Sequence, residues 1–482
     1  MNSVPFKQIK GKEGLKLLPF RFERLNNNEV FLSNLAGEWI IVPPAEFGQL
    51  INCEFTDEEV QRKFESKHFV ADGRPDLAVR LTALKVATRM RRLLDLTGLH
   101  IFVVTLRCEH ACEYCQVSRQ NSASTEFDMS HEDAMRALDI VFQSPSPNIK
   151  IEFQGGESLL NFPLIKEITI RAKQLNEIFQ RNLAFVIATN LVPLSTEILD
   201  FAELHSIHFS TSLDGPAALH NANRARPGRN SHELATKGIQ DVRTRLGQDY
   251  VSALMTTTER SLSQPEAIID EYVRMGLDSV FLRFLSPYGF AVKSGAKNKY
   301  RSREWLEFYK RGLEYIVELN RSGTQMTEVL ASIYLKKILT NDTGGYVDLS
   351  TPTGAGLSTL VYNYDGDVYC SDEGRMLREM GDTTFRLGSV RTHKFSELIL
   401  SDRLLDAIEA SFAPSSPMCC DCAFEPFCGS DPVIHHTTQG DFTGHKPTSE
   451  FCERTMTIVP LLLKMYSEDR YCRDLFNRWS SR

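Results

Sequence analysis

The chain has 482 residues, of which 42% are hydrophobic and 24% charged, and its formal net charge at pH 7 is −7. This is the composition of an ordinary globular protein, and its length favours two or three domains. The acidic balance argues against a general nucleic-acid binder or a binder of anionic membranes. No apolar run approaches the roughly 20 residues that cross a bilayer, and residues 1–7 carry no apolar signal core. We therefore expect a cytoplasmic protein with neither nucleic acid nor membrane among its partners.

The eleven cysteines are distributed unevenly along the chain. Ten lie at or beyond Cys108, and five crowd between Cys419 and Cys452. Thiols in a reducing compartment bind metal or perform chemistry more often than they form disulfides. The clustering therefore predicts metal sites.

Residues 1–97 are predicted to form a separate N-terminal module. Residues 29–32 and 38–42 have the pattern of two short strands, and Thr56 with Glu59 forms a capping box at a helix start. A strand pair followed by helices is compatible with a winged-helix-like module that recruits precursor peptides. It is equally compatible with a docking extension of no separate function.

Alternating strand and helix patterns begin at residue 98. The predicted strands cover residues 100–105, 149–153, 184–188, 207–213, 251–255 and 280–284, with helices such as 162–179 between them. Six such units predict an α/β fold, a partial (β/α)6 TIM-like barrel whose active site lies at the carboxyl ends of the strands. We expect this core to span residues 98–300. A helical connector with helices at 303–319 and 326–339 then spans residues 301–345, and a cysteine-rich extension spans residues 346–482.

Three cysteines follow the first predicted barrel strand with the spacing C-x3-C-x2-C, namely Cys108, Cys112 and Cys115. Thiolates are the usual iron ligands in iron–sulfur clusters, and three of them leave one iron of a 4Fe–4S cluster open. A structural zinc loop and three unrelated thiols are the alternatives. The spacing, with Tyr114 before the last cysteine, resembles the signature of radical S-adenosylmethionine (SAM) enzymes. That resemblance implies that the open iron chelates SAM and that an electron from the cluster cleaves SAM to a 5′-deoxyadenosyl radical.

Further motifs of the same family follow later strands, each of which taken alone is an ordinary turn or cap. The resemblance implies that the Gln154, Gly155, Gly156 and Glu157 motif holds the amino group of SAM. It places Thr189, Asn190, Ser212 and Asp214 near the ribose and the methionine, and makes Arg224 a candidate for the SAM carboxylate, with Arg226 nearly as good. Ser158 and Leu191 depart from the family pattern, which more often has proline and glycine there.

Four cysteines near the carboxyl end, Cys419, Cys422, Cys428 and Cys452, come from a compact loop and one returning segment. Four thiolates saturate either a 4Fe–4S cluster or a zinc ion, and the spacing leaves both open. The pattern resembles the SPASM extension of radical SAM enzymes that act on peptides.

That extension usually carries two auxiliary clusters, and this chain departs from it at two ligand positions. Thr353 and Pro432 stand where the family places cysteines, and both positions belong to the first auxiliary cluster, of which only Cys370 survives. The resemblance therefore implies one auxiliary 4Fe–4S cluster, held by the four cysteines from Cys419 to Cys452. Cys420 fits no position in the pattern.

The resemblance as a whole is to a radical SAM/SPASM maturase, an oxidoreductase that modifies a ribosomally synthesised peptide or protein. Residues 18–25 and the single auxiliary cluster look most like the radical SAM maturase of the His-Xaa-Ser repeat system. That likeness implies a precursor with His-Xaa-Ser repeats, a second radical SAM maturase, and a small redox donor such as flavodoxin or ferredoxin.

Two alternatives stay open at this stage. One is an anaerobic sulfatase-maturating type, which oxidises Cys or Ser to formylglycine. The other is a non-catalytic zinc-binding adaptor on a barrel scaffold. No residue in the sequence is identified as a catalytic base.

Overall fold

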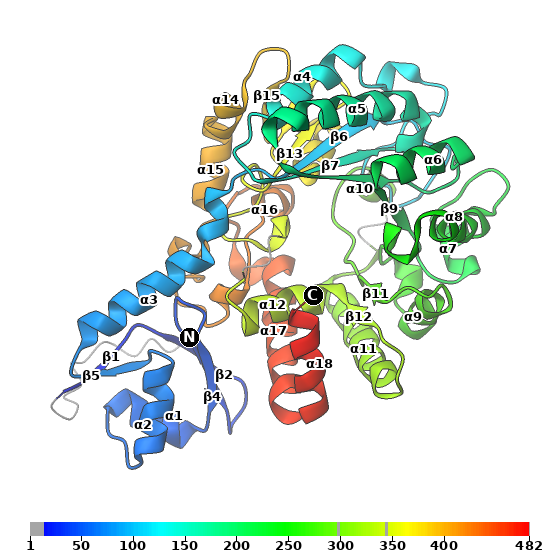
Figure 1. Ribbon diagram of the computed structural model, residues 1–482. Helices are drawn as coiled ribbons and strands as arrows, with labels where there is room; N and C mark the ends of the chain where they lie inside the picture. Colours follow the sequence, from blue (N-terminus) through cyan, green and yellow to red (C-terminus); the bar gives the residue numbers. More distant parts are fainter. Residues whose placement is uncertain (1–13, 296–298, 343–345, 482) are drawn as a thin grey trace.

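The computed structural model describes residues 14–295, 299–342 and 346–481, so that residues 1–13 of the expected N-terminal module lie outside it (Figure 1). Its centre is an eight-stranded sheet of order β10-β9-β8-β7-β6-β13-β14-β15. Neighbouring strands from β10 to β13 are parallel, whereas β14 and β15 pair antiparallel. The strands are β6 Leu99–Thr105, β7 Asn148–Gly155, β8 Asn182–Ala188, β9 Ile207–Ser212, β10 Val251–Leu254, β13 Thr359–Tyr362, β14 Asp367–Tyr369 and β15 Arg386–Ser389.

Five of the six expected barrel strands are consecutive parallel strands of this sheet, β6 to β10. On β7, Ile149, Ile151 and Phe153 are buried in the main core, while the alternate residues Glu152 and Gln154 lie on the opposite face. Helices run along the apolar face of the sheet, as α4, α5 and α6 show in Figure 1. They are α4 His131–Val141, α5 Phe162–Phe179, α6 Thr196–His205, α7 Ala217–Asn223, α8 Ser231–Leu246 and α9 Pro265–Arg274.

The sixth expected strand differs from the prediction. Only Ser279–Val280 form a strand, β11, and it pairs with β12, Thr327–Glu328, rather than with β10. The chain still passes beside the end of β10, because the backbone N–H of Thr257 donates to the carbonyl oxygen of Arg283 at 3.0 Å. The fold is therefore the expected open barrel, with a short and displaced last strand.

Helix α10 Phe290–Lys293 lies at the end of the expected core, and the connector contains α11 Ser302–Arg321 and α12 Val329–Leu339. The last of these begins later than the sequence pattern predicts, since residue 326 precedes β12. The Glu328 carboxylate accepts the backbone N–H of Ala331 at 2.6 Å, which satisfies a helix donor and ends the strand.

The N-terminal elements form a separate antiparallel sheet of order β2-β3-β4, followed by helices. Strands β3 and β4 are the two that the sequence predicts. Asp57, not Thr56, caps the second helix, because its carboxylate accepts the N–H of Glu59 at 2.8 Å. The elements are β1 Leu15–Leu17, β2 Arg21–Arg24, β3 Val30–Ser33, β4 Trp39–Val42, α1 Pro44–Asn52, α2 Glu58–Ser66, β5 Val70–Asp72 and α3 Pro75–Arg89, where β1 pairs with β5.

This small sheet packs against the carboxyl-terminal cysteine loop, far away in the sequence. The Phe31 ring, fully buried, stacks on Phe424 with centroids 5.2 Å apart and meets Phe427 edge-on at 6.2 Å. Arg21 forms a 2.6 Å ion pair with Glu425, and both side chains are largely buried. Strands β2 and β3 therefore brace the loop that carries Cys419, Cys422 and Cys428.

The carboxyl-terminal region continues as helices. In Figure 1, α14 and α15 lie beside β15, α16 lies near the centre, and α17 and α18 lie below it. The helices are α13 Asp372–Arg378, α14 Phe395–Ile399, α15 Asp402–Ala410, α16 Pro432–Gln439, α17 Glu450–Glu468 and α18 Arg470–Ser480. In the described part of the chain, no helix combines the length and apolarity that spanning a membrane requires.

The brace predicts a long-range effect of Phe31→Ala. Removing a buried aromatic ring costs about 3–5 kcal/mol, and here the loss falls on the contact with residues 423–427. We expect faster amide hydrogen exchange in that segment, measured by mass spectrometry. Phe22→Ala, on the neighbouring strand and 40% exposed, is the control and should leave exchange there unchanged. Equal exchange in both variants would contradict the brace.

Candidate active site

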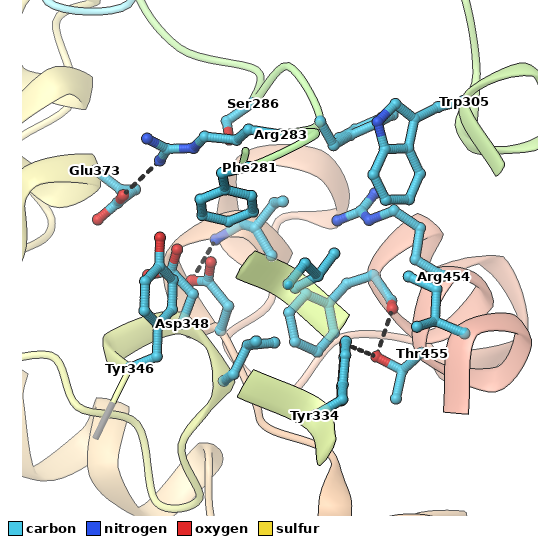
Figure 2. Close-up of a pocket in the computed structure, with 17 residues that line it drawn as sticks. Phe281, Arg283, Ser286, Trp305, Tyr334, Tyr346, Asp348, Glu373, Arg454 and Thr455 are labelled. Atoms are coloured by element: carbon cyan, nitrogen blue, oxygen red, sulfur yellow. Dashed lines mark hydrogen bonds and ion pairs between the residues drawn. The ribbon is translucent and has the colours of Figure 1, made fainter. Parts of the chain in front are cut away.

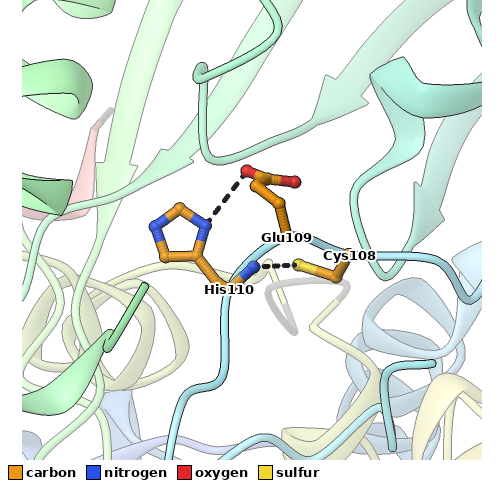
Figure 3. Close-up of side chains that lie close together, drawn as sticks. All are labelled: Cys108, Glu109 and His110. Atoms are coloured by element: carbon orange, nitrogen blue, oxygen red, sulfur yellow. Dashed lines mark hydrogen bonds and ion pairs between the residues drawn. The ribbon is translucent and has the colours of Figure 1, made fainter. Parts of the chain in front are cut away.

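The cysteine loop lies directly after β6, at the carboxyl edge of the parallel strands. Backbone hydrogen bonds close it: the N–H of Cys108 donates to Gln120 (3.1 Å), and the N–H of Ala111 donates to Ala225 (2.6 Å). Figure 3 shows the start of the loop, where the N–H of His110 points at the Cys108 sulfur, 3.4 Å away. The loop therefore presents its thiols from a backbone anchored at both ends.

The cysteine loop packs so closely against the end of β7 that residues 155 and 156 must be glycine. The N–H of Gly156 donates to the Thr105 carbonyl at 2.9 Å, and the N–H of Glu157 donates to the Arg107 carbonyl at 2.7 Å. A Cβ at Gly155 would lie 1.7 Å from the Thr105 oxygen, and one at Gly156 would lie 2.5 Å from the Arg107 oxygen. Only glycine fits at these two positions.

Glu157 is fully buried and serves as a tie between two strand ends. Its carboxylate accepts hydrogen bonds from the Leu159 N–H (3.0 Å), the Thr189 hydroxyl (2.6 Å) and the Asn190 N–H (2.7 Å). Burial, and then the nearby Glu109 carboxylate, raise the pKa of Glu157 to about 7. Glu157, Thr189 and the Asn190 backbone are thus hydrogen-bonded to one another. These bonds hold the end of β8 against the end of β7.

Asp214 gathers Tyr114 and Arg224 beside the cysteine loop. The Tyr114 hydroxyl donates to Asp214 Oδ2 at 2.7 Å, and Nε of Arg224 donates to the same oxygen at 3.1 Å. The Arg224 guanidinium lies 5.3 Å from the centre of the Tyr114 ring. Arg224, predicted for the SAM carboxylate, is thus a partner in a largely buried ion pair with Asp214.

A chain of hydrogen bonds, which the sequence did not reveal, links this group to the cysteine loop. The Asp214 N–H donates to Nδ1 of His220 (3.2 Å), so that Nε2 of this ring carries the proton and donates to the Ser231 hydroxyl (3.1 Å). Ser231 is also hydrogen-bonded to Nε2 of His110 (2.7 Å), whose Nδ1 lies 3.1 Å from Glu109 and 2.9 Å from the Asn190 amide nitrogen. Burial lowers the pKa of His220 to about 3, so its ring is neutral at pH 7.

Glu109 was also not predicted, although a carboxylate between the first two cysteines was a visible signal. Its Oε1 accepts from the Asn190 side chain at 2.7 Å, while its Oε2 is buried without a hydrogen-bond partner among the described residues. The other predicted residues lie at the ends of strands: Gln154 donates to Glu152 at 2.7 Å, and Ser212 ends β9. An unsatisfied acceptor at this edge fits a ligand that brings a donor, such as the amino group of SAM.

The thiols of the loop lie in an environment that suits metal ligands. Burial raises the pKa of Cys112 to about 12, which the Arg224 charge partly offsets, and burial likewise raises the pKa of Cys108. Buried thiolates need compensating positive charge, which a bound cluster supplies. The donor set of Cys108, Cys112 and Cys115 thus fits the iron–sulfur cluster that their spacing predicts.

The four carboxyl-terminal thiols also come together. Each of the thiols of Cys419, Cys428 and Cys452 adds to the rise in the pKa of a neighbour in the group, with burial as the larger cause. Within the described chain, no three cysteine sulfurs lie within 4.8 Å of one another. Tetrahedral zinc, with Zn–S bonds of about 2.3 Å, holds its sulfurs roughly 3.8 Å apart. The donor set of four thiols fits either an iron–sulfur cluster or a zinc ion.

The positions of the missing cysteines have ordinary structural roles. The hydroxyl of Thr353 accepts the Ala355 N–H at 3.2 Å, and Pro432 is the first residue of α16. Cys370 is only 1% exposed, and the Gly356 N–H donates to its carbonyl at 2.6 Å.

Comparison with known proteins gives a family for the barrel. Residues 102–256 match the model of the Radical SAM superfamily. The uncharacterized protein MJ0907 of Methanocaldococcus jannaschii is 26% identical over 271 residues, which cover 56% of this chain and 82% of that protein. The uncharacterized protein sll1766 of Synechocystis is 25% identical over 223 residues, 45% of this chain and 54% of that protein.

Solved structures share the fold at low sequence identity. Native anSMEcpe with bound AdoMet has a TM-score of 0.63 at 15% identity, over 79% of this chain and 99% of that one. Streptococcus suis SuiB bound to the precursor peptide SuiA has a TM-score of 0.53 at 15% identity, over 90% of this chain and 98% of that one. Residues 102–256 thus match the radical SAM domain, a type that uses SAM and a 4Fe–4S cluster.

The close backbone approach predicts that Gly155→Ala prevents closure of the cysteine loop. A methyl group 1.7 Å from a carbonyl oxygen forces the backbone apart, at a cost of about 4 kcal/mol or more. We expect the reconstituted variant to bind less iron than the parent, measured by colorimetric iron analysis. Gly48→Ala, in α1 with open space around it, is the matched control and should bind as much iron as the parent. Full iron loading of Gly155→Ala would contradict this account of the loop.

Proposed function

We propose that the protein is a radical SAM maturase that modifies a ribosomally synthesised peptide or protein. The observation that carries the proposal is the three-cysteine loop anchored at the carboxyl edge of the sheet, where active sites of such barrels lie. When bound, the cluster and SAM supply a 5′-deoxyadenosyl radical that removes a hydrogen atom from the substrate.

In this proposal, Cys108, Cys112 and Cys115 hold the cluster, and the residues around them bind and orient SAM. Glu109 offers a buried acceptor to the amino group of SAM. The N–H groups of Arg224 that do not bind Asp214 donate to the carboxylate of SAM. Tyr114 positions both Asp214 and Arg224. Closure of the site by the carboxyl-terminal region excludes water from the radical.

A polypeptide substrate is supported by two structural neighbours, solved with peptides. One is SuiB with its precursor peptide SuiA, and the other is native anSMEcpe with AdoMet and the Cp18Cys peptide, at a TM-score of 0.62 and 15% identity. Residues 1–97 are proposed to recruit the substrate. Strand β2 pairs only with β3 in the described residues, so its other edge is available to an extended peptide.

We further propose one auxiliary 4Fe–4S cluster on Cys419, Cys422, Cys428 and Cys452. The buried Lys337 ammonium donates to the carbonyl oxygens of Cys428 and Leu349, which places a positive charge beside this thiolate group. Such a cluster accepts an electron from the substrate radical or braces the substrate channel. A small redox donor such as flavodoxin or ferredoxin supplies electrons.

The finer identity of the substrate is also a proposal. A precursor with His-Xaa-Ser repeats and a second radical SAM maturase as partner follow from the likeness in residues 18–25 and from the single auxiliary cluster, and a cytoplasmic location is proposed from the sequence composition. The alternative is oxidation of a cysteine or serine to formylglycine. The fold shared with anSMEcpe, solved with the Cp18Cys peptide, supports this alternative. Mass spectrometry separates the two, since formylglycine formation from cysteine exchanges sulfur for oxygen in the product.

The radical chemistry predicts production of 5′-deoxyadenosine. Anaerobically reconstituted protein with dithionite and SAM should form it, and Cys112→Ala should not, because two thiolates do not retain the cluster. Chromatography with mass detection measures the product. Cys53→Ala, which changes a buried thiol among the N-terminal elements, is the control and should retain the product. Undiminished 5′-deoxyadenosine from Cys112→Ala would refute the proposal.

The single auxiliary cluster predicts the iron content. The parent should hold about eight irons, and mutation of Cys108, Cys112 and Cys115 together should leave about four. Cys370→Ala, the control, should change the iron content little, because one thiolate does not hold a cluster without its partners. A triple variant that keeps about eight irons would mean that two auxiliary clusters are present. Zinc in place of the remaining iron would favour the adaptor alternative for this region.

A further inference from the structure

A pocket lies between the exit of β11 and the carboxyl-terminal elements, beside the positions of the two missing cysteines. Figure 2 shows that its walls come from residues 281–286 of the barrel, from α12, from the turn around Asp348, and from α13, α16 and α17. Three carboxylates line it, those of Asp348, Glu373 and Asp431. Asp431 directly precedes Pro432, so an acidic wall stands where relatives are expected to place a cluster ligand.

The carboxylates outnumber the cations that face them. Arg283 is the partner of Glu373, with 3.8 Å between Nη2 and Oε1. Arg454, the other guanidinium in the wall, lies 4.1 Å from the centre of the Phe284 ring and donates to the Ser302 hydroxyl at 3.2 Å. Asp348 has no hydrogen bond to its carboxylate among the described residues, so the pocket has a surplus of negative charge.

The carboxyl groups of the pocket have raised pKa values. Burial, and then Glu373, raise the pKa of Asp431 to about 7, although two helix N–H groups donate to its Oδ1. Burial and mutual repulsion also raise the pKa values of Asp348 and Glu373. Buried carboxylates without enough cations are satisfied either by protons or by a cation that enters from outside.

The shape of the pocket selects among cations. Phe281 and Tyr346 form an edge-to-face pair, with ring centres 6.1 Å apart, in the wall of the pocket. Aromatic rings beside carboxylates accommodate the apolar stem of a long basic side chain and attract its charged end. A metal ion fits less well, because in the described residues no three carboxylate oxygens of this pocket lie within 4.8 Å of one another.

The pocket is close to the cysteine loop. Ser286, in its wall, accepts a hydrogen bond from the side chain of Gln116 at 3.1 Å, and Gln116 follows Cys115 directly. The N–H of Phe290 donates to the Cys115 carbonyl at 2.8 Å. The wall of the pocket is therefore joined to the end of the cysteine loop by hydrogen bonds.

We propose that the acidic pocket of Asp348, Glu373 and Asp431 binds a lysine or arginine side chain of the polypeptide substrate. The proposal rests on the proposed function for the identity of the ligand as a peptide. It goes beyond that function by naming the chemistry of a substrate residue and the side chains that recognise it. The bound cation anchors the peptide and places a neighbouring residue at the radical.

The test uses binding alone and does not depend on turnover. The probes are N-acetyl-arginine methylamide and N-acetyl-citrulline methylamide, which have nearly the same shape but differ in charge. Saturation-transfer NMR with the full chain, reconstituted with iron and SAM, should show at least about tenfold stronger binding of the arginine probe, since a charged hydrogen-bonded contact contributes roughly 1.5–3 kcal/mol. Equal binding of the two probes would overturn the proposal.

Substitutions locate the site. Asp348→Asn and Glu373→Gln should each weaken the arginine probe about tenfold and leave the citrulline probe unchanged. Glu468→Gln, at an exposed acid on α17, is the control and should change neither. The amides keep the volume of the acids and remove repulsion, so thermal unfolding should show that both variants remain folded. Arginine binding that survives in both folded variants would place the cation elsewhere and overturn the proposal.

Failure of the two proposals can be told apart. If 5′-deoxyadenosine forms but neither variant affects arginine binding, the radical function stands and the basic-residue pocket is wrong. If arginine binds as expected but no 5′-deoxyadenosine forms, the pocket stands as a binding site and the proposed radical function is wrong.

Discussion

The cysteine loop depends on two backbone hydrogen bonds at the end of β7, formed where only glycine leaves room. Because the N–H groups of Gly156 and Glu157 reach the carbonyls of Thr105 and Arg107, the loop is fastened to the sheet rather than suspended above it. The same contact also positions the Glu157 side chain. Its carboxylate accepts hydrogen bonds from Thr189 and Asn190 at the end of β8. The family resemblance assigns the glycine pair to SAM binding. In this structure the pair also allows the cysteine loop to pack against the end of β7. Any contact that Gly155 and Gly156 make with SAM therefore comes from a backbone that the cysteine loop holds in place.

Buried charge is the second constraint on the structure. Thiols in both cysteine groups, the carboxylates of the acidic pocket, and Lys337 beside Cys428 all lie where water does not screen them. Each therefore needs a partner, which for Lys337 is a pair of carbonyl oxygens. In the acidic pocket, three carboxylates face two guanidinium groups among the described residues.

Departures from the family pattern become intelligible once the tertiary contacts are known. Leu191 stands where glycine is usual, and its φ of +62° is in the left-handed region that glycine prefers. Its side chain is 2% exposed and packs so closely on α8 that a Cβ at Gly238 would lie 2.6 Å from Leu191 Cβ. Burial of a leucine, worth roughly 1.5–3 kcal/mol, offsets the backbone strain of about 1–3 kcal/mol. A glycine lost at one position is thus matched by a glycine on the neighbouring helix.

The sequence by itself determined the local features: the cysteine spacing, the glycine pair, the strands from β6 to β10, and α5 with its bounds at Phe162 and Phe179. These depend on residues near one another in the chain, where periodicity and spacing carry the information. Only the tertiary structure decided the contacts between distant segments. It added β13 to the barrel sheet beside β6, displaced β11 to pair with β12, set Phe31 against Phe424, and joined His110 to His220 through Ser231. Such contacts depend on complementary shape and charge between surfaces that meet only when the whole chain has folded, and no local pattern encodes them.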